Sequence, residues 1–177
     1  MDFAFTDEQL AVAEAASGLL AGLVTPDRIS AVELTDDRVD RELWAALAAA
    51  DLLGLAVPET HGGAGYHLTE LCLLLQAQGN VVAPVPLWAT LVLGALPIAT
   101  NGSAAMQARW LPDVVAGRVM LTAALTGSAN SVSGLPTVHA TPEGEGWVLN
   151  GTELAVPQAN IADRIVVPAR TADGRVV

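Results

Sequence analysis

Apolar residues follow a helical spacing through most of the first 117 residues of the chain, and short strand-like runs follow. Thr6-Asp7-Glu8-Gln9 has the pattern of a capping box, in which the Thr6 hydroxyl and the Gln9 amide satisfy backbone groups at a helix start. The apolar positions after it predict one helix face: Leu10, Val12, Ala16, Leu19, Leu20 and Leu23. Asp40 is the predicted N-cap of a further helix. Its apolar face is Leu43, Trp44, Leu47 and Ala48.

Residues 51–80 combine an apolar run, a cluster of glycines and a second apolar run. A proline stops the first run, Leu52–Val57. The glycines that follow predict a tight turn with positive φ: Gly62, Gly63 and Gly65. A helix is expected from near Leu68 to the C-cap residues Gly79-Asn80. Its apolar positions are too dense for a surface stripe, so we expect it to be buried on most sides.

The chain carries no charged residue between Leu71 and Ala108, which raises the question of a membrane span. A spanning helix needs about 20 consecutive apolar residues. Prolines leave only Leu87–Leu96 uninterrupted, which is too short to cross, and no arginine flanks this segment closely. We therefore expect no membrane partner, and a buried helix over Leu87–Leu96.

From Met120 onward the pattern changes to short β-type runs separated by turn residues. The runs are Met120–Leu125, Thr137–Ala140, Trp147–Leu149 and Ile165–Val167. Pro142–Gly146 is one turn signal, and Asn150-Gly151 is a strong tight-turn dipeptide. We expect an α+β protein with an all-α domain over residues 1–117 and an incomplete β-rich domain over residues 118–177. Residues 120–170 should be mostly strand.

Charge and cysteine content exclude several classes of function. The net charge of −11, with eight arginines and no lysine, argues against nucleic acid and anionic membranes as partners. The single cysteine, Cys72, cannot form an internal disulfide, fits a reducing cytoplasm and is expected in the core. Glu59, His61 and His67 lack the spacing of a metal site, so no metal is predicted.

Four segments of the chain resemble the acyl-CoA dehydrogenase family. They are the start Phe5–Gln9, LLGLAVPETHGGAGYHLTEL in the glycine stretch, QARWLPDVVAGR ending at Arg118, and GWVLNGTELAVPQANIAD ending at Asp163. The resemblance implies a flavoprotein that uses FAD to desaturate acyl-CoA thioesters. It implies a helical N-terminal domain, a β-barrel-like middle domain, and a C-terminal helical domain that we expect to be absent here. It also implies a dimer or tetramer, and some members pair two different subunits of which one keeps a complete flavin site.

The same resemblance assigns positions to the flavin and to the substrate. The flavin positions are Leu125, Thr126, Gly127, Ser128, Ala155, Val156 and Pro157, and the substrate positions are Val132 and Ser133. Gly127 and Ser128 stand where the family has glutamate and proline, and Val132 cannot donate the hydrogen bond of the family's serine. Ala155 stands where an aromatic ring covers the flavin. Pro157 replaces a threonine and has neither a hydroxyl nor a backbone N–H.

Two functions remain open from the sequence. The family's catalytic base is a glutamate of the C-terminal domain, so no catalytic residue is assigned in this chain. The favoured function is a supporting subunit or fragment with a degraded flavin site, in a homo- or hetero-oligomer that binds acyl-CoA. The alternative is a catalytically competent FAD-binding acyl-CoA dehydrogenase subunit. Under the favoured function, the isolated chain neither holds FAD nor dehydrogenates acyl-CoA.

Overall fold

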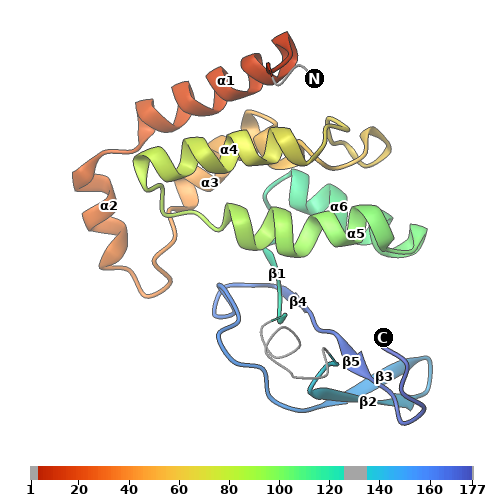
Figure 1. Cartoon of the computed structure of the whole chain (residues 1–177). Coiled ribbons are helices and arrows are strands. Elements are labelled where there is room, and N and C mark those ends of the chain that lie inside the picture. The colour runs from red at the N-terminus through yellow and green to blue at the C-terminus, as the bar shows by residue number, and fades with distance from the viewer. Residues whose placement is uncertain (1–3, 126–134, 177) are drawn as a thin grey trace.

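The computed structural model of the chain describes residues 4–125 and 135–176. The helices are α1 (Asp7–Leu23), α2 (Pro26–Glu33), α3 (Arg41–Ala49), η1 (Leu52–Gly54), η2 (Glu59–His61), α4 (Leu68–Val81), η3 (Trp88–Ala95), α5 (Leu96–Asn101) and α6 (Ala104–Val115). The strands are β1 (Leu121–Ala123), β2 (Val138–Glu143), β3 (Gly146–Asn150), β4 (Arg164–Val166) and β5 (Ala169–Arg170). Figure 1 shows the helices packed together, with β1 leading down to the remaining strands. A domain boundary at Gly117 stays a prediction.

The first helix begins at the predicted capping box. Thr6 Oγ1 accepts a hydrogen bond from the Gln9 backbone N–H at 3.2 Å, and the Gln9 side-chain oxygen accepts one from the Thr6 N–H at 3.1 Å. The Gln9 amide also donates to Glu70 Oε1 of α4 at 2.9 Å. The buried residues of α1 are Val12, Ala16 and Leu20. These contacts hold α1 along α4, as Figure 1 shows.

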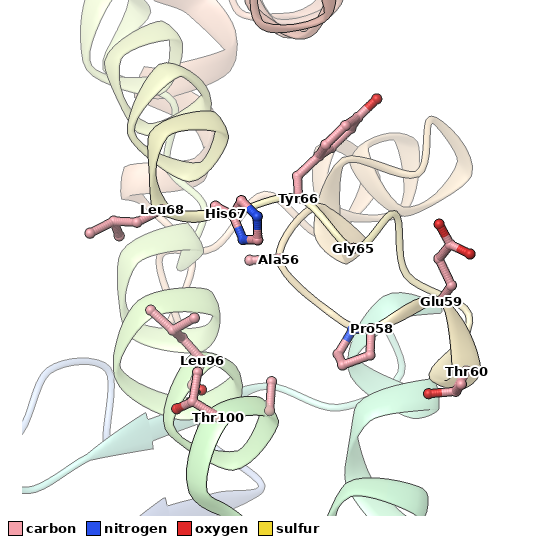
Figure 2. A pocket seen from close by; sticks show the side chains of 11 residues that line it. Ala56, Pro58, Glu59, Thr60, Gly65, Tyr66, His67, Leu68, Leu96 and Thr100 are labelled. Atoms are coloured by element: carbon pink, nitrogen blue, oxygen red, sulfur yellow. The ribbon is translucent and has the colours of Figure 1, made fainter.

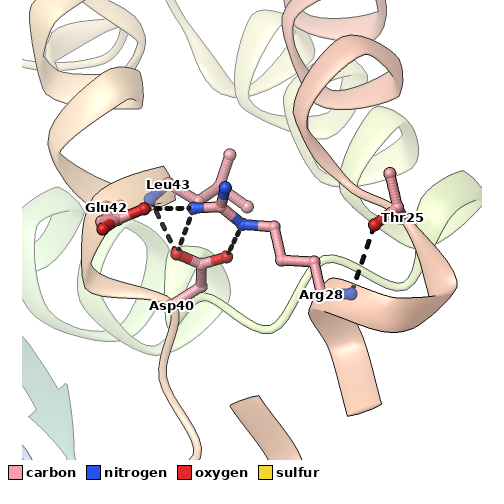
Figure 3. Close-up of polar contacts among 5 residues, drawn as sticks. All are labelled: Thr25, Arg28, Asp40, Glu42 and Leu43. Carbon is pink, nitrogen blue, oxygen red and sulfur yellow. Dashed lines mark hydrogen bonds and ion pairs between the residues drawn. The ribbon is translucent and has the colours of Figure 1, made fainter. Parts of the chain in front are cut away.

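An ion pair fixes α2 against α3 (Figure 3). Asp40 is the N-cap of α3, as predicted, and its Oδ1 accepts from the Leu43 N–H at 2.9 Å. The Arg28 guanidinium donates to both carboxylate oxygens of Asp40, from Nη2 to Oδ1 at 2.8 Å and from Nε to Oδ2. The Asp40 side chain is only 4% exposed. The hydrogen bonds from Arg28 outweigh this burial and hold the pKa of the Asp40 carboxyl below its usual range.

The helical core gathers side chains from most of the helices and extends into the first strand. Its fully buried members include Leu20, Leu43, Leu47, Leu53, Leu71, Leu74, Leu87, Leu111, Val114 and Leu121. Trp44 belongs to this core, as expected, and its Nε1–H donates to the Gly117 carbonyl at 3.0 Å. Because Leu121 lies in β1, the core does not stop where the helices stop.

The uncharged segment Leu87–Leu96 is helical and largely buried, as predicted. It forms the π-helix η3, which continues into α5, and Trp88 is its one large side chain that is about half exposed. Among the described residues, no single helix is long and apolar enough to span a membrane. The pair α1 and α2 passes that test by length and composition, with a bend of 74° between the two helices.

The strands form two small sheets. β1 pairs with β4 in parallel, with Leu121 opposite Arg164, and the second sheet has the order β3-β2-β5. The expectation that residues 120–170 are mostly strand is wrong in extent, because the connection from β3 to β4 contains no strand. Ala155 and Gln158 in that connection have φ values of 53° and 55°, which a strand does not accommodate.

Two reciprocal hydrogen bonds fix the start of β1 to the residue before β4. The Met120 N–H donates to Asp163 Oδ2 at 2.8 Å, and the Asp163 N–H donates to the Met120 carbonyl at 2.8 Å. Asp163 belongs to the segment that carries the family resemblance. The structure gives it the role of a connector between the helical core and the strands.

Two predictions about α4 are wrong. The helix does not end at Gly79-Asn80 but continues to Val81, and Val82 takes the left-handed conformation with φ 52°. The Gln78 amide donates to the carbonyls of two residues beyond the helix, which ties down its C-terminal end. Cys72 is exposed rather than part of the core, because it lies on the outer face of α4.

One turn prediction is confirmed and the other is wrong. The hairpin of β2 and β3 turns within Pro142–Gly146, because Glu143 is paired with Gly146. Asn150-Gly151 makes no hairpin turn, because Asn150 is still paired with His139. A Cβ on Gly151 would lie 2.9 Å from the Val138 Cα, so glycine serves here for close backbone approach.

Candidate functional site

A groove of about 610 Å³ lies where the glycine loop faces α5 (Figure 2). We call it the glycine-loop groove, and it is lined by Ala56, Pro58, Glu59, Thr60, Gly65, Tyr66, His67, Leu68, Leu96, Ala99 and Thr100. Its volume falls in the usual range for ligand pockets, about 300–1,000 Å³. Volume alone assigns no chemistry, so the polar groups around the groove decide what it can do.

The glycine loop is held by close contact with the chain before it. Gly62 and Gly65 have the predicted positive φ values, 85° and 69°. Gly63 does not have a positive φ; it is required for another reason, because its Cβ would lie 2.1 Å from the Val57 carbonyl oxygen. The Tyr66 N–H donates to the Leu55 carbonyl at 2.8 Å. The loop is therefore a rigid wall of the groove.

The polar side chains around the groove do not converge on one point. Figure 2 shows the Tyr66 hydroxyl and the Glu59 carboxylate pointing away from Leu96 and Thr100. His67 is the N-cap residue of α4, and its backbone N–H donates to Glu70 Oε2 at 2.9 Å. The described residues contain no group of His, Cys, Asp or Glu side chains suited to a metal ion. The groove can therefore hold a ligand by its shape, but its described side chains do not bring a nucleophile and a base together.

Glu70 acts as a capping residue at the start of α4. Burial opposes its ionisation, but hydrogen bonds from the Gln9 side chain and the His67 N–H outweigh that effect. They hold the pKa of the Glu70 carboxyl below its usual range. A carboxylate that is kept ionised and already accepts two hydrogen bonds is a structural group, so Glu70 is not a candidate base.

The structure places β1, which precedes the first segment assigned to the flavin, beside the second segment, Ala155–Pro157. Thr122 of β1 donates from Oγ1 to the Pro157 carbonyl at 2.7 Å. A hollow of about 230 Å³ is lined by both Ala124 and Val156. Leu125 follows at the exposed end of this strand. The other assigned positions lie outside the described residues: Thr126, Gly127, Ser128, Val132 and Ser133.

The described residues at this place do not fit a tight flavin site. Ala155, Val156 and Pro157 present no side-chain donor and no aromatic surface. Ala155 is exposed and has a left-handed φ of 53°. The hollow beside them is smaller than ordinary ligand pockets, which start at about 300 Å³. The side chains of Ala155, Val156 and Pro157 therefore supply little for FAD.

Two polar residues that sequence reasoning did not single out have notable positions. Thr122 is fully buried, and the only sequence signal was a hydroxyl residue inside an apolar run. Thr90 of η3 is also fully buried, and its Oγ1 has no hydrogen-bond partner among the described residues. The hydrogen bond from Thr122 to Pro157 could be identified only from the folded structure, because the two residues are 35 positions apart in the sequence.

Comparisons with known proteins agree with this architecture. A model of the family described as "Acyl-CoA dehydrogenase, N-terminal domain" matches residues 6–118. Acyl-CoA dehydrogenase FadE27 of Mycobacterium tuberculosis is 34% identical over 177 residues, which are 100% of this chain and 46% of that protein. The chain thus spans about half the length of the relatives it matches.

Solved structures also match this chain over nearly its whole length. The ChsE4-ChsE5 complex from Mycobacterium tuberculosis matches with a TM-score of 0.89 and 34% identity, over 99% of this chain and 48% of that one. The Tcur3481-Tcur3483 steroid ACAD G363A variant matches with a TM-score of 0.86 and 44% identity, over 95% of this chain and 46% of that one. The family model alone covers more than half of the chain, and the protein therefore belongs to the acyl-CoA dehydrogenase family.

Proposed function

We propose that this chain is a supporting subunit of an acyl-CoA dehydrogenase, located in the cytoplasm. The assembled enzyme removes hydrogens from the α and β carbons of an acyl-CoA thioester, and FAD is the hydride acceptor in that chemistry. This chain supplies scaffold and interface, while a related chain supplies the flavin-binding groups and the base. The chain itself then contributes no proton transfer.

The observation that carries the proposal is the segment Ala155–Pro157. The Thr122 hydroxyl holds this segment beside β1, so its place relative to the strand is fixed. Its three side chains nevertheless offer neither a hydrogen-bond donor nor a ring. An aromatic contact is worth about 0.5–1.5 kcal/mol beyond area burial, and a hydrogen bond is worth about 0.5–1.5 kcal/mol. Losses of this size at several positions reduce FAD affinity by about two to three decades.

The names of two similar structures support a partner chain. One is the ChsE4-ChsE5 complex and the other is a Tcur3481-Tcur3483 assembly, so each of these relatives is named together with a second component. Acyl-CoA is the substrate class that the family name indicates. We extend both features to this chain as part of the proposal.

The alternative is a subunit that binds FAD and is catalytically competent. It is favoured by the placement of Ala124 and Val156 around one hollow, because backbone groups there could still contact a flavin. The two functions differ in one measurable property, which is the affinity of the purified chain for FAD.

Titration of the purified chain with FAD, followed by flavin fluorescence, tests the proposal. We expect no stoichiometric binding in the sub-micromolar range. Pro157→Thr restores a hydroxyl and a backbone N–H, and should strengthen binding by about one decade or less. Pro168→Thr, between β4 and β5, is the matched control and should change nothing. Tight, stoichiometric binding by the wild-type chain would refute the supporting role and establish the alternative.

A further inference from the structure

Two arginines from different elements lie against one tryptophan where α6 meets β4. Arg109 Cζ lies 4.8 Å from the centroid of the Trp110 ring, and Arg164 Cζ lies 5.1 Å from it. Arg109 and Trp110 belong to α6, and Arg164 is the first residue of β4 (Figure 1). Both distances are within the range of about 6 Å over which an aromatic ring attracts a guanidinium group. We call these three residues the Trp110 cluster.

The cluster is held in place by the fold. Trp110 is half-buried and packs against the helical core. Arg164 Nη1 donates to the Asp163 carbonyl, and the Asp163 carboxylate is itself held by the Met120 N–H. Arg109 and Arg164 remain exposed, so a binding partner can reach both of them. A partner that binds here therefore orders less side-chain freedom than it would at unrestrained surface arginines.

Neither arginine of the cluster has a carboxylate partner in the described part of the chain. The arginines that form ion pairs there are Arg28, Arg41, Arg118 and Arg175. Asp113, on the same helix as Arg109, pairs with Arg118. Because each guanidinium carbon lies about 5 Å from one centroid, the two are at most about 10 Å apart. Two positive charges at this spacing repel each other and attract an anion.

The surroundings of the cluster allow an anion to approach. The chain has a net charge of −11, but residues 71–177 hold six acidic residues and five arginines, so most of the negative charge belongs to residues 1–70. Met106 lies one helical turn before Trp110 and is 46% exposed, which adds apolar surface beside the ring. Arginine, tryptophan and methionine are enriched at protein–protein interfaces. The composition therefore favours a protein segment over a free inorganic anion, which makes no use of apolar surface.

We propose that the Trp110 cluster and Met106 form a docking site for an acidic segment of a partner protein, whose two carboxylates pair with Arg109 and Arg164. A guanidinium group presents a planar fork of donors that fits a carboxylate with two parallel hydrogen bonds. In an extended segment, every second side chain lies on the same face, about 6.6–6.8 Å from the next. Two glutamates at that spacing can reach both arginines. The inference does not rest on the proposed function, because it requires neither FAD nor acyl-CoA.

The test is the binding of a fluorescently labelled peptide of alternating glutamate and alanine to the full chain, followed by fluorescence anisotropy. A peptide with glutamine in place of glutamate is the control ligand, and it should bind at least about tenfold more weakly. Arg109→Gln and Arg164→Gln should each weaken binding of the glutamate peptide by about threefold to tenfold. Arg38→Gln is the matched control, because it removes the same charge from an exposed arginine outside the cluster, and should change the affinity by less than about twofold.

A further variant separates docking from general attraction between charges. Arg109→Lys keeps the charge but loses the planar fork, so it should recover less than half of the affinity lost in Arg109→Gln. Full recovery by lysine would overturn the proposal, and so would an equal loss in Arg38→Gln. Equal binding of the glutamate and glutamine peptides would also overturn it. Orthophosphate that binds the chain as tightly as the glutamate peptide would assign the cluster to a small anion instead.

Discussion

Replacing Asp40 separates the two roles of this buried carboxylate, which caps α3 and pairs with Arg28. Asparagine at an N-cap is about as good as aspartate, so Asp40→Asn keeps the hydrogen bond from the Leu43 N–H and loses the charge. Asp40→Ala loses both. The two variants therefore divide the contribution of one side chain between a local contact and a contact between helices.

The magnitudes follow from the geometry. Hydrogen bonds to charged groups contribute about 1.5–3 kcal/mol, and Arg28 remains 28% exposed, so water recovers part of that loss. We expect Asp40→Asn to lower the free energy of unfolding by about 1.5 kcal/mol. Loss of a cap costs about 1 kcal/mol more, so Asp40→Ala should lower it by about 2.5 kcal/mol. Asp37→Asn, which breaks the exposed pair with Arg41, is the control and should have little effect.

Urea unfolding followed by helical circular dichroism measures both variants, and Arg28→Gln completes a double-mutant cycle with Asp40→Asn. Because the pKa of Asp40 is lowered in the folded chain, the stabilisation by its ionised form is fully present above the unfolded value near pH 4 and is lost as pH falls through the folded value. The difference between wild type and Asp40→Asn should therefore shrink below about pH 4. Additive effects of Arg28→Gln and Asp40→Asn, or a difference that grows in acid, would refute the reasoning.

Two further predictions concern single contacts. Gly63→Ala should destabilise the chain by about 3 kcal/mol in urea unfolding, because its Cβ would lie 2.1 Å from the Val57 carbonyl oxygen. A Cβ on Gly22 meets no atom of the described residues within 4 Å, so the control Gly22→Ala should stabilise α1 by about 0.5–1 kcal/mol. Equal effects of the two variants would contradict the clash at Gly63. Thr122→Val removes the donor to the Pro157 carbonyl and should lower the free energy of unfolding by about 1–3 kcal/mol, and Thr122→Ser should recover most of that loss. If Thr122→Val leaves the free energy of unfolding unchanged, the hydrogen bond contributes nothing to stability.

The sequence predicted those features of the helical part that depend on residues close together along the chain. The capping box at Thr6 and the cap at Asp40 needed only three or four residues to be recognised, and both are present. The buried Trp44 followed from the helical period. Exposure of Cys72 could not be predicted this way, because it depends on which face of α4 the other helices leave uncovered.

The site was predictable only in part. The resemblance implied that Leu125 and the Ala155–Pro157 segment belong to one site, and the structure places Ala124 and Val156 around one hollow. The hydrogen bond that fixes this arrangement comes from Thr122, which looked like an ordinary strand residue. Long-range partners of a buried hydroxyl have no periodic signal, so such contacts need the fold before they can be named.

The pairing of β1 with β4 also has a consequence during synthesis. The paired residues Met120 and Asp163 are 43 positions apart, whereas the helices that receive β1 precede it in the chain. At a synthesis rate of about 5–20 residues per second, β1 waits roughly 2–9 seconds for its partner strand. During that interval its free edge could pair with another chain. Because β1 is only three residues long and its first residue, Leu121, is buried in the helical core, that edge offers few unpaired backbone groups.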